Sequence, residues 1–268
     1  MPQQPSAALL SGLGFQHPLE QFESSNLTAV TAFKVKAAYF ENVTLAGETF
    51  PFPTVELDES SYLDLTALVK DGHLNWGAPS GNSTWRIFSF WGHYTNQRSN
   101  AGGTFATSVI GNGSWTVDHF SKTGAKVTTD FWDQNILYDT EIANLLKTVG
   151  EYSWEDSMEI LASLYWTPDL VERFEQSRGY GLIKYLPLLF TYTDSWNGIL
   201  PPYPEQFHYG NYTTDGTSIY NLDCRTILNE SYKDFVSHYA EWSHSKGFKF
   251  SDQPAYNLPL TMVSSEDP

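Results

Sequence analysis

The stretch Tyr152-Ser153-Trp154-Glu155-Asp156-Ser157-Met158-Glu159 places three carboxylates among aromatic and apolar residues. A helical pattern at residues 142–149 precedes it and ends at Gly150, and a second helix start, Thr167-Pro168, follows it. A short β-like run between two helices is typical of a strand in an α/β fold. We therefore predict a strand here, in a protein of the α/β class.

Two acidic side chains follow directly from this predicted strand. Side chains at the carboxyl end of a strand in an α/β fold face the ligand crevice. Asp156 and Glu159 stand at the strand end and in the loop after it, so they are candidates for an active site. The alternative is a solvated acidic loop in an acidic protein, because clustered carboxylates are also often structural.

Composition limits the classes of function. The 268 residues suffice for one large or two small domains, and an aromatic share of 16% makes a packed core feasible. A formal net charge of -16 repels phosphate backbones, which argues against nucleic-acid binding. The apolar runs are too short to span a bilayer, and no basic amphipathic stretch would hold the chain on a membrane.

The start of the chain argues against secretion, whereas its glycosylation motifs argue for it. The first residues lack the basic start and apolar core of a secretory signal, and the single cysteine, Cys224, excludes an internal disulfide. Six Asn-x-Ser/Thr sequons nevertheless favour a secreted, glycosylated eukaryotic protein. They are Asn26, Asn42, Asn82, Asn112, Asn211 and Asn229. A longer secreted polypeptide of which this chain is a piece would reconcile the two observations.

Strand and turn signals dominate the first part of the chain. Residues 28–39 and 55–65 alternate loosely between apolar and polar, and Asp71-Gly72 is a strong turn signal. The aromatic run at residues 85–94 predicts a buried strand. We therefore predict a β-rich segment over residues 1–95.

Helices alternate with strands in the remainder. Ser121 caps a predicted helix, so Asp118 and His119 lie where a strand or loop enters it. Such a place often holds active-site groups, although a histidine there is more often structural. Residues 223–244 form the strongest helical pattern, and a strand with polar groups at its end follows at residues 248–256. This alternation predicts a parallel sheet.

Several short strings occur together in a distinctive order. They are Asp64-Leu65-Thr66, Asp71-Gly72-x-Leu74-x-Trp76-x-x-Pro79, Val117-Asp118-His119-Phe120-Ser121, Asp156-Ser157-x-Glu159, Trp166-Thr167-Pro168, Gly179-Tyr180 and Tyr185-Leu186-Pro187. In order and spacing, the chain resembles a segment of the α-L-rhamnosidases of glycoside hydrolase family 106. The resemblance extends over residues 60–258.

The resemblance implies a fold and an activity. The implied fold is a (β/α)8 TIM-type barrel, incomplete here, with the β-rich segment in front and residues 96–268 as a partial barrel that forms the catalytic region. The implied reaction is inverting hydrolysis of terminal α-L-rhamnosides, taken from a plant or microbial polysaccharide or glycoside. The resemblance also implies a calcium ion near the sugar.

The resemblance also implies roles for particular residues. An inverting hydrolase needs a carboxylic acid and a carboxylate base about 6.5–9.5 Å apart. Glu159 matches a family carboxylate, and we expect it to be catalytic, as the base rather than the acid. Asp156 would orient it or bind sugar hydroxyls. The residues expected to bind the sugar are Asp118, His119, Trp154 and Gln253.

Departures from the family pattern leave two further readings open. We expect the chain to begin inside the barrel region and to end before the family's second acidic residue and much of the calcium shell, so we assign no metal ligands. The chain is then an incomplete enzyme, or a carbohydrate-binding or structural remnant without catalysis. A third reading is an unrelated secreted α/β domain with an aromatic core.

Overall fold

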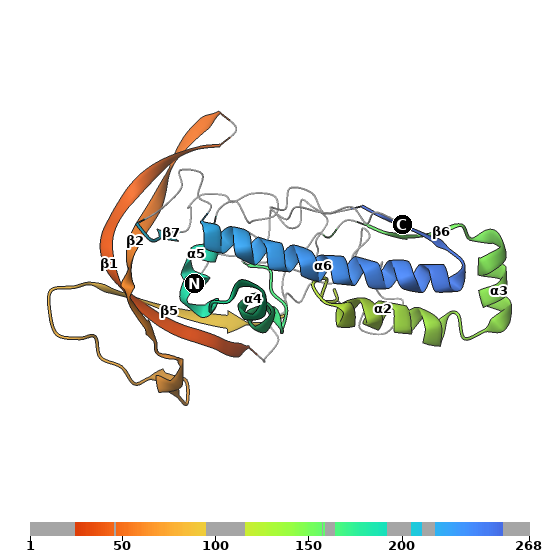
Figure 1. Ribbon diagram of the computed structural model, residues 1–268, viewed down its shortest axis with the longest axis horizontal. Helices are drawn as coiled ribbons and strands as arrows, with labels where there is room; N and C mark the ends of the chain where they lie inside the picture. The colour runs from red at the N-terminus through yellow and green to blue at the C-terminus, as the bar shows by residue number, and fades with distance from the viewer. Residues whose placement is uncertain are drawn as a thin grey trace, which may run out of the picture.

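The structure is a computed structural model that describes residues 25–45, 47–94, 116–156, 158, 164–191, 205–210 and 218–253. Figure 1 shows how its elements are arranged. Its strands are β1 (Asn26–Leu45), β2 (Glu48–Asp64), β3 (Val69–Lys70), β4 (His73–Leu74), β5 (Trp85–Gly92), β6 (Tyr152–Glu155), β7 (Gln206–His208) and β8 (Lys249–Asp252). Its α-helices are α2 (Lys122–Asn135), α3 (Thr140–Val149), α4 (Leu170–Arg178), α5 (Leu186–Leu189) and α6 (Ile219–Lys246), and two short 3-10 helices are η1 (Thr66–Leu68) and η2 (Ile183–Tyr185).

A long curved hairpin of β1 and β2 stands at one end of the molecule (Figure 1). The two strands alternate in sequence, and Gly47 lies in the turn between them with a φ of 87°, which glycine adopts without steric cost. The sheet order is β5-β1-β2-β7. β1 is antiparallel to both of its neighbours, whereas β7 runs parallel to β2. The main sheet therefore takes strands from both of the predicted segments.

The two faces of this sheet are covered differently. One face contributes to a buried cluster with residues from α5 and from the end of β7, which comprises Phe33, Val55, Leu57, Leu188 and Tyr209. The other face buries Val30, Ala32 and Leu65, with residues of the β3–β4 segment packed against them. The predicted Asp71-Gly72 turn joins β3 and β4, with positive φ angles at both residues. Each fully buried large side chain contributes about 1.5–3 kcal/mol.

Helix α6 runs along the length of the molecule, with α2 and α4 beside it (Figure 1). Ser218 caps its first turn by accepting a hydrogen bond from Asn221 N, and Gly247 ends it in the left-handed conformation. Within the helical pattern predicted at residues 223–244, Leu228, Tyr232 and Phe235 are buried. No described helix, α6 included, combines the length and apolar character needed to cross a membrane.

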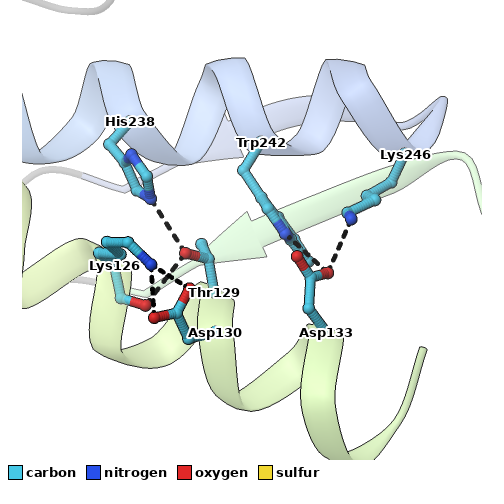
Figure 2. A network of polar contacts seen from close by, with 7 residues as sticks. All are labelled: Lys126, Thr129, Asp130, Asp133, His238, Trp242 and Lys246. Carbon is cyan, nitrogen blue, oxygen red and sulfur yellow. Dashed lines mark hydrogen bonds and ion pairs between the residues drawn. The ribbon is translucent and has the colours of Figure 1, made fainter. Parts of the chain in front are cut away.

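Polar contacts join α2 to α6 along one side (Figure 2). Asp133 of α2 accepts hydrogen bonds from the Trp242 indole at 3.1 Å and from the Lys246 ammonium at 2.7 Å. Further along, the Thr129 hydroxyl lies 2.9 Å from Nε2 of His238. These contacts hold α2 against α6, and the predicted site residues 118 and 119 lie just before the start of α2.

Helix α2 begins after Ser121 as predicted. Val127 and Phe131 are exposed, whereas Ala125 and Thr129 are buried, so the helix packs on α6 through its small residues rather than through its large apolar ones. In α4, Leu170 and Phe174 are buried, and Gly179 ends the helix with a φ of 75°.

The predicted incomplete (β/α)8 TIM-type barrel is wrong: no closed barrel exists within the described part of the chain. Helix–strand alternation produces one parallel pair, β6 with β8, which forms a two-stranded sheet apart from the main one. The long runs before residue 95 pair as antiparallel neighbours, and β1 and β2 need only a short turn between them. The fold of the described residues is therefore a mixed sheet packed against helices.

Candidate active site

The parallel pair β6–β8 brings two acidic strand ends to the same edge. In its register Glu155 pairs with Asp252, and Gln253 N donates a hydrogen bond to Glu155 O at 3.0 Å. Asp156 and Gln253 follow directly after these two positions. The parallel pairing predicted from the helix–strand alternation is confirmed here, and it places the end of the opening stretch beside the end of the last described strand.

Side chains along β6 alternate between two faces. Tyr152 and Trp154 are exposed, at 56% and 60% of their surface, whereas Ser153 and Glu155 turn toward α6. The Ser153 hydroxyl lies 2.5 Å from the hydroxyl of Ser243 in α6, which fixes the inner face. Trp154 and Glu155 therefore point to opposite sides of the strand pair, so they cannot contact the same small ligand from one face.

Glu155 is the most perturbed carboxyl group of this region. Its side chain keeps only 17% of its surface exposed. Burial, and then the negative charge of Asp252, raise the pKa of Glu155 to about 8. Its Oε2 atom is buried and has no hydrogen-bond partner among the described residues. A carboxyl group in this environment retains its proton at neutral pH.

Asp252 lies beside Glu155 on the same face of the strand pair. Residues in register on neighbouring strands are roughly 4.8 Å apart and point the same way. Burial raises the pKa of Asp252 as well. The phenol of Tyr232 in α6 also faces this pair, since both carboxyls contribute to raising its pKa after burial. Two like charges at this spacing are unfavourable, which keeps one of the two carboxyls neutral.

His119 faces Glu155 from the segment before α2. Its Nδ1 lies 2.8 Å from Val117 O, its ring packs 4.7 Å from the ring of Phe235, and its Nε2 lies 3.7 Å from Glu155 Oε1. A carbonyl only accepts, so Nδ1 carries the proton and Nε2 turns its lone pair toward Glu155. Burial holds the pKa of His119 below 6.5, although Val117 and Asp118 oppose this shift. Near neutral pH the contact therefore joins two uncharged groups.

Asp118 holds the turn in place with both of its oxygens. Oδ1 accepts a hydrogen bond from Phe120 N at 2.8 Å, and Oδ2 accepts one from the buried Thr167 hydroxyl at 2.7 Å. The turn approaches α2 so closely that a Cβ on Gly124 would lie 1.8 Å from Asp118 O. Asp118 thus has a structural task in this fold, and its expected contact with sugar stays a prediction.

The structure brings some of the sequence candidates together. Asp118, His119, Asp156 and Gln253 come from segments that meet around the carboxyl ends of β6 and β8. Asp156 is exposed and Gln253 is half-buried. Trp154 faces the other side, and Glu159 lies outside the described residues. Among the sequons, Asn26, Asn42 and Asn82 are exposed, Asn229 is half-buried in α6, and Asn112 and Asn211 lie outside the described residues.

Two acidic residues of this cluster were missed by sequence reasoning, namely Glu155 and Asp252. The usable signal was the period of two along each strand, which puts Glu155 on the face of Ser153 and Asp252 on the face of Phe250. That signal is short, since each strand has four residues. The register between strands that lie far apart in sequence carries no local signal at all.

The expected calcium ion would need six to eight oxygen ligands. No group of three or more His, Cys, Asp or Glu side chains suited to a metal occurs within the described ranges. The calcium ion implied by the resemblance therefore stays a prediction.

Comparison with known proteins identifies the family. The sequence profile of glycoside hydrolase family 106, described as alpha-L-rhamnosidase, matches residues 10–193, which is more than half of the chain. The chain belongs to glycoside hydrolase family 106. The family match includes the strands β1 to β6 and residues 118, 119 and 154–159. Asp252 and Gln253 lie beyond its end.

Two individual relatives of this family 106 chain are much longer than it is. A Formosa agariphila protein with the provisional name beta-glucuronidase is 27% identical over 199 residues, which are 74% of this chain and 15% of that protein. A solved rhamnosidase from Novosphingobium sp. PP1Y is 16% identical, with a TM-score of 0.44 over 87% of this chain and 27% of that chain. The chain therefore spans 27% or less of the relatives that it matches.

Proposed function

We propose that the chain is part of a glycoside hydrolase that cleaves terminal α-L-rhamnosides with inversion. The family match supports hydrolysis of a glycosidic bond. The structural observation that carries the proposal is the meeting of two acidic strand ends, Glu155-Asp156 and Asp252-Gln253, at one edge of a parallel pair. Glycoside hydrolysis needs one protonated and one ionised carboxyl group near each other. The strand ends supply carboxyl groups in both environments, buried and exposed.

In this proposal the roles follow position. Glu159, three residues beyond exposed Asp156, acts as the base that activates water, and Asp156 orients it or binds sugar hydroxyls. Gln253 binds sugar hydroxyls from the neighbouring strand. His119 and Asp118 support the site through contacts within the protein. His119 contacts Glu155 and Val117, and Asp118 accepts hydrogen bonds from Phe120 and Thr167.

The test is the rate at which an aryl α-L-rhamnoside releases its phenol. Glu159→Gln keeps the size of the side chain but cannot accept a proton, so we expect turnover to fall at least about 100-fold. The control is Glu141→Gln, an exposed carboxylate on α3. The assay is run on the 268-residue chain and on any longer product of its gene. Equal rates for Glu159→Gln and Glu141→Gln would exclude the assigned role.

Inversion is tested separately, on the sugar that is released. Proton NMR during the first minutes of the reaction distinguishes the two anomers before they interconvert. We expect the anomer opposite in configuration to the substrate to appear first. First release of the α-anomer would replace inversion by retention and leave glycoside hydrolysis standing.

One observation favours a second function, binding of carbohydrate without cleavage. Tyr152 and Trp154 form an exposed aromatic pair on the outer face of β6, and the Lys249 ammonium lies 5.0 Å from the centre of the Tyr152 ring. Such aromatic faces suit the apolar face of a sugar ring. A glycan-binding screen separates the two functions. Binding that Trp154→Ala abolishes, in a chain that releases no phenol from the aryl rhamnoside, would favour the second.

A further inference from the structure

Glu155 occupies a position from which it can control the place of the residues after it. We propose that Glu155 is a positioning residue of the proposed active site, where its carboxyl group lies between Asp252 and His119 at the end of β6 and so holds Asp156 beside Gln253. The last step rests on the proposed function. The contact between the two strand ends does not, and it can be tested by itself.

The first argument is the register of β6 and β8. Glu155 and Asp252 are directly paired, so their side chains lie side by side on the face turned to α6. Two ionised carboxylates there would repel each other in a poorly solvated space. Protonation of one of the two carboxyl groups removes this repulsion. The strand ends are therefore held together best while Glu155 is neutral.

The second argument is the orientation of His119. Its Nδ1–H is bonded to Val117 O, and Phe235 fixes the plane of its ring, so Nε2 is presented to Glu155 as an acceptor. An acceptor at this place suits a protonated carboxyl and does nothing for an ionised one. At 3.7 Å the Nε2–Oε1 contact is longer than a hydrogen bond, so His119 orients Glu155 without binding it tightly.

Burial and the negative charge of Asp252 favour the neutral form of Glu155. Asp252 faces it from β8, His119 from the segment before α2, and Tyr232 and Tyr239 from α6. Among the described residues, no lysine or arginine contributes to the pKa shift of Glu155. Its pKa is raised from 4.5 to about 8, so its contribution to stability is fully present below about pH 4.5 and is lost as pH rises through about 8.

The consequence is specific to one end of the strand pair. Gln253 N bonds to Glu155 O at the acidic end, whereas Lys249 N bonds to Glu151 O at the opposite end. Ionisation of Glu155 loosens the first of these bonds and leaves the second in place. The two backbone amides therefore report the proposed effect and its internal control.

The experiment measures solvent exchange of these two amide protons by NMR, at pH 6 and pH 9, corrected for intrinsic exchange. In the natural chain we expect protection of the Gln253 amide to fall roughly 10- to 100-fold between these values, while that of Lys249 stays constant. Glu155→Gln, which is neutral at every pH, keeps Gln253 protected at both. Glu155→Ala removes the joining group and leaves Gln253 unprotected at both.

Two results would overturn the inference. One is an equal fall in Gln253 protection in the natural chain and in Glu155→Gln. The other is no fall in the natural chain. If Glu155→Ala does not fold, the comparison of the natural chain with Glu155→Gln decides alone. Glu230→Gln, an exposed carboxylate on α6, must behave as the natural chain does.

A different observation tests the proposed function. In a preparation that cleaves the aryl rhamnoside, the fall of kcat at alkaline pH moves to higher pH in Glu155→Gln, and an unmoved profile contradicts the positioning role. Absence of all turnover, together with the expected Gln253 result, overturns the proposed reaction and retains the contact between the strand ends.

Discussion

At the scale of single residues, Gly124 decides whether the site can form. The turn that carries Asp118 and His119 passes directly over the first turn of α2, where Ser121 accepts a hydrogen bond from Gly124 N at 3.0 Å. A methyl group on residue 124 would occupy the space of Asp118 O, and backbone cannot move aside as a flexible side chain can.

We expect Gly124→Ala to lower the free energy of unfolding by about 3 kcal/mol or more, because the turn must separate from α2. Urea denaturation followed by tryptophan fluorescence measures the change. Gly77→Ala is the matched control, since a Cβ there meets nothing within 4 Å. Similar midpoints for the two variants would show that the turn tolerates displacement.

Signals from neighbouring residues predicted a helix cap correctly, but they did not indicate that Glu155 is the buried acid. Ser121 was predicted to begin a helix and does so, because its hydroxyl satisfies a local backbone requirement, and Gly179 and Gly247 end helices for a similarly local reason. The environment of Glu155, in contrast, comes from α6 and β8, which lie roughly a hundred residues further on and leave no mark near it. The choice of Asp156 over Glu155 therefore could not be made from neighbouring residues.

At the scale of elements, the contact between α2 and α6 depends on polar groups more than on large apolar ones. Asp133 serves two donors of α6 at once, from the penultimate turn and the last (Figure 2). Asp130, in comparison, forms an ion pair with Lys126 within α2 itself. Asp133 therefore binds α2 to α6, whereas the ion pair of Asp130 stays within its own helix.

We expect Asp133→Ala to destabilise the chain by about 1 kcal/mol, because the Trp242 N–H and the Lys246 ammonium lose their acceptor. Asp130→Ala should cost only about 0.3–0.5 kcal/mol, as is usual for an exposed pair within one helix. Thermal unfolding of the two variants at low ionic strength measures the difference. A larger loss for Asp130→Ala would mean that Asp130 also supports the helix contact.

Element existence was predictable, whereas element pairing was not. The alternating runs of β1 and β2 and the helical runs of α3, α4 and α6 were visible in the sequence, because period and caps are local. The partner of β7, which joins β2 in parallel, is set by contacts across about 150 residues. The wrong barrel was implied by the family resemblance, whereas the helix–strand alternation predicted a parallel sheet, of which the pair β6–β8 is present.

At the scale of the whole molecule, excess negative charge opposes the compact state. The formal net charge is -16 at pH 7. A folded chain holds these charges closer together than an unfolded one does, so self-repulsion lowers its stability. Salt shortens the range of this repulsion from about 30 Å at 0.01 M to about 8 Å at 0.15 M.

We therefore expect the melting temperature to rise between 0.01 M and 0.15 M sodium chloride, by about 2–4 °C for each kcal/mol of repulsion removed. Differential scanning calorimetry measures it, and potassium chloride at equal ionic strength should give the same rise. A lower melting temperature in salt would show that attractive ion pairs, such as Lys184–Glu59, outweigh the net charge.

Because side chains alternate along β6, a register shift of one residue against β8 would move every side chain of the strand to the opposite face. If the strand moved by a single position, Trp154 would turn inward against α6 and Glu155 would enter bulk water. An indole would then have to fit where a carboxyl now sits between Asp252 and His119. The sequence of β6 thus opposes the misaligned arrangement in two ways, because a large ring would have to fit inside and a buried carboxyl group would lose its place beside Asp252.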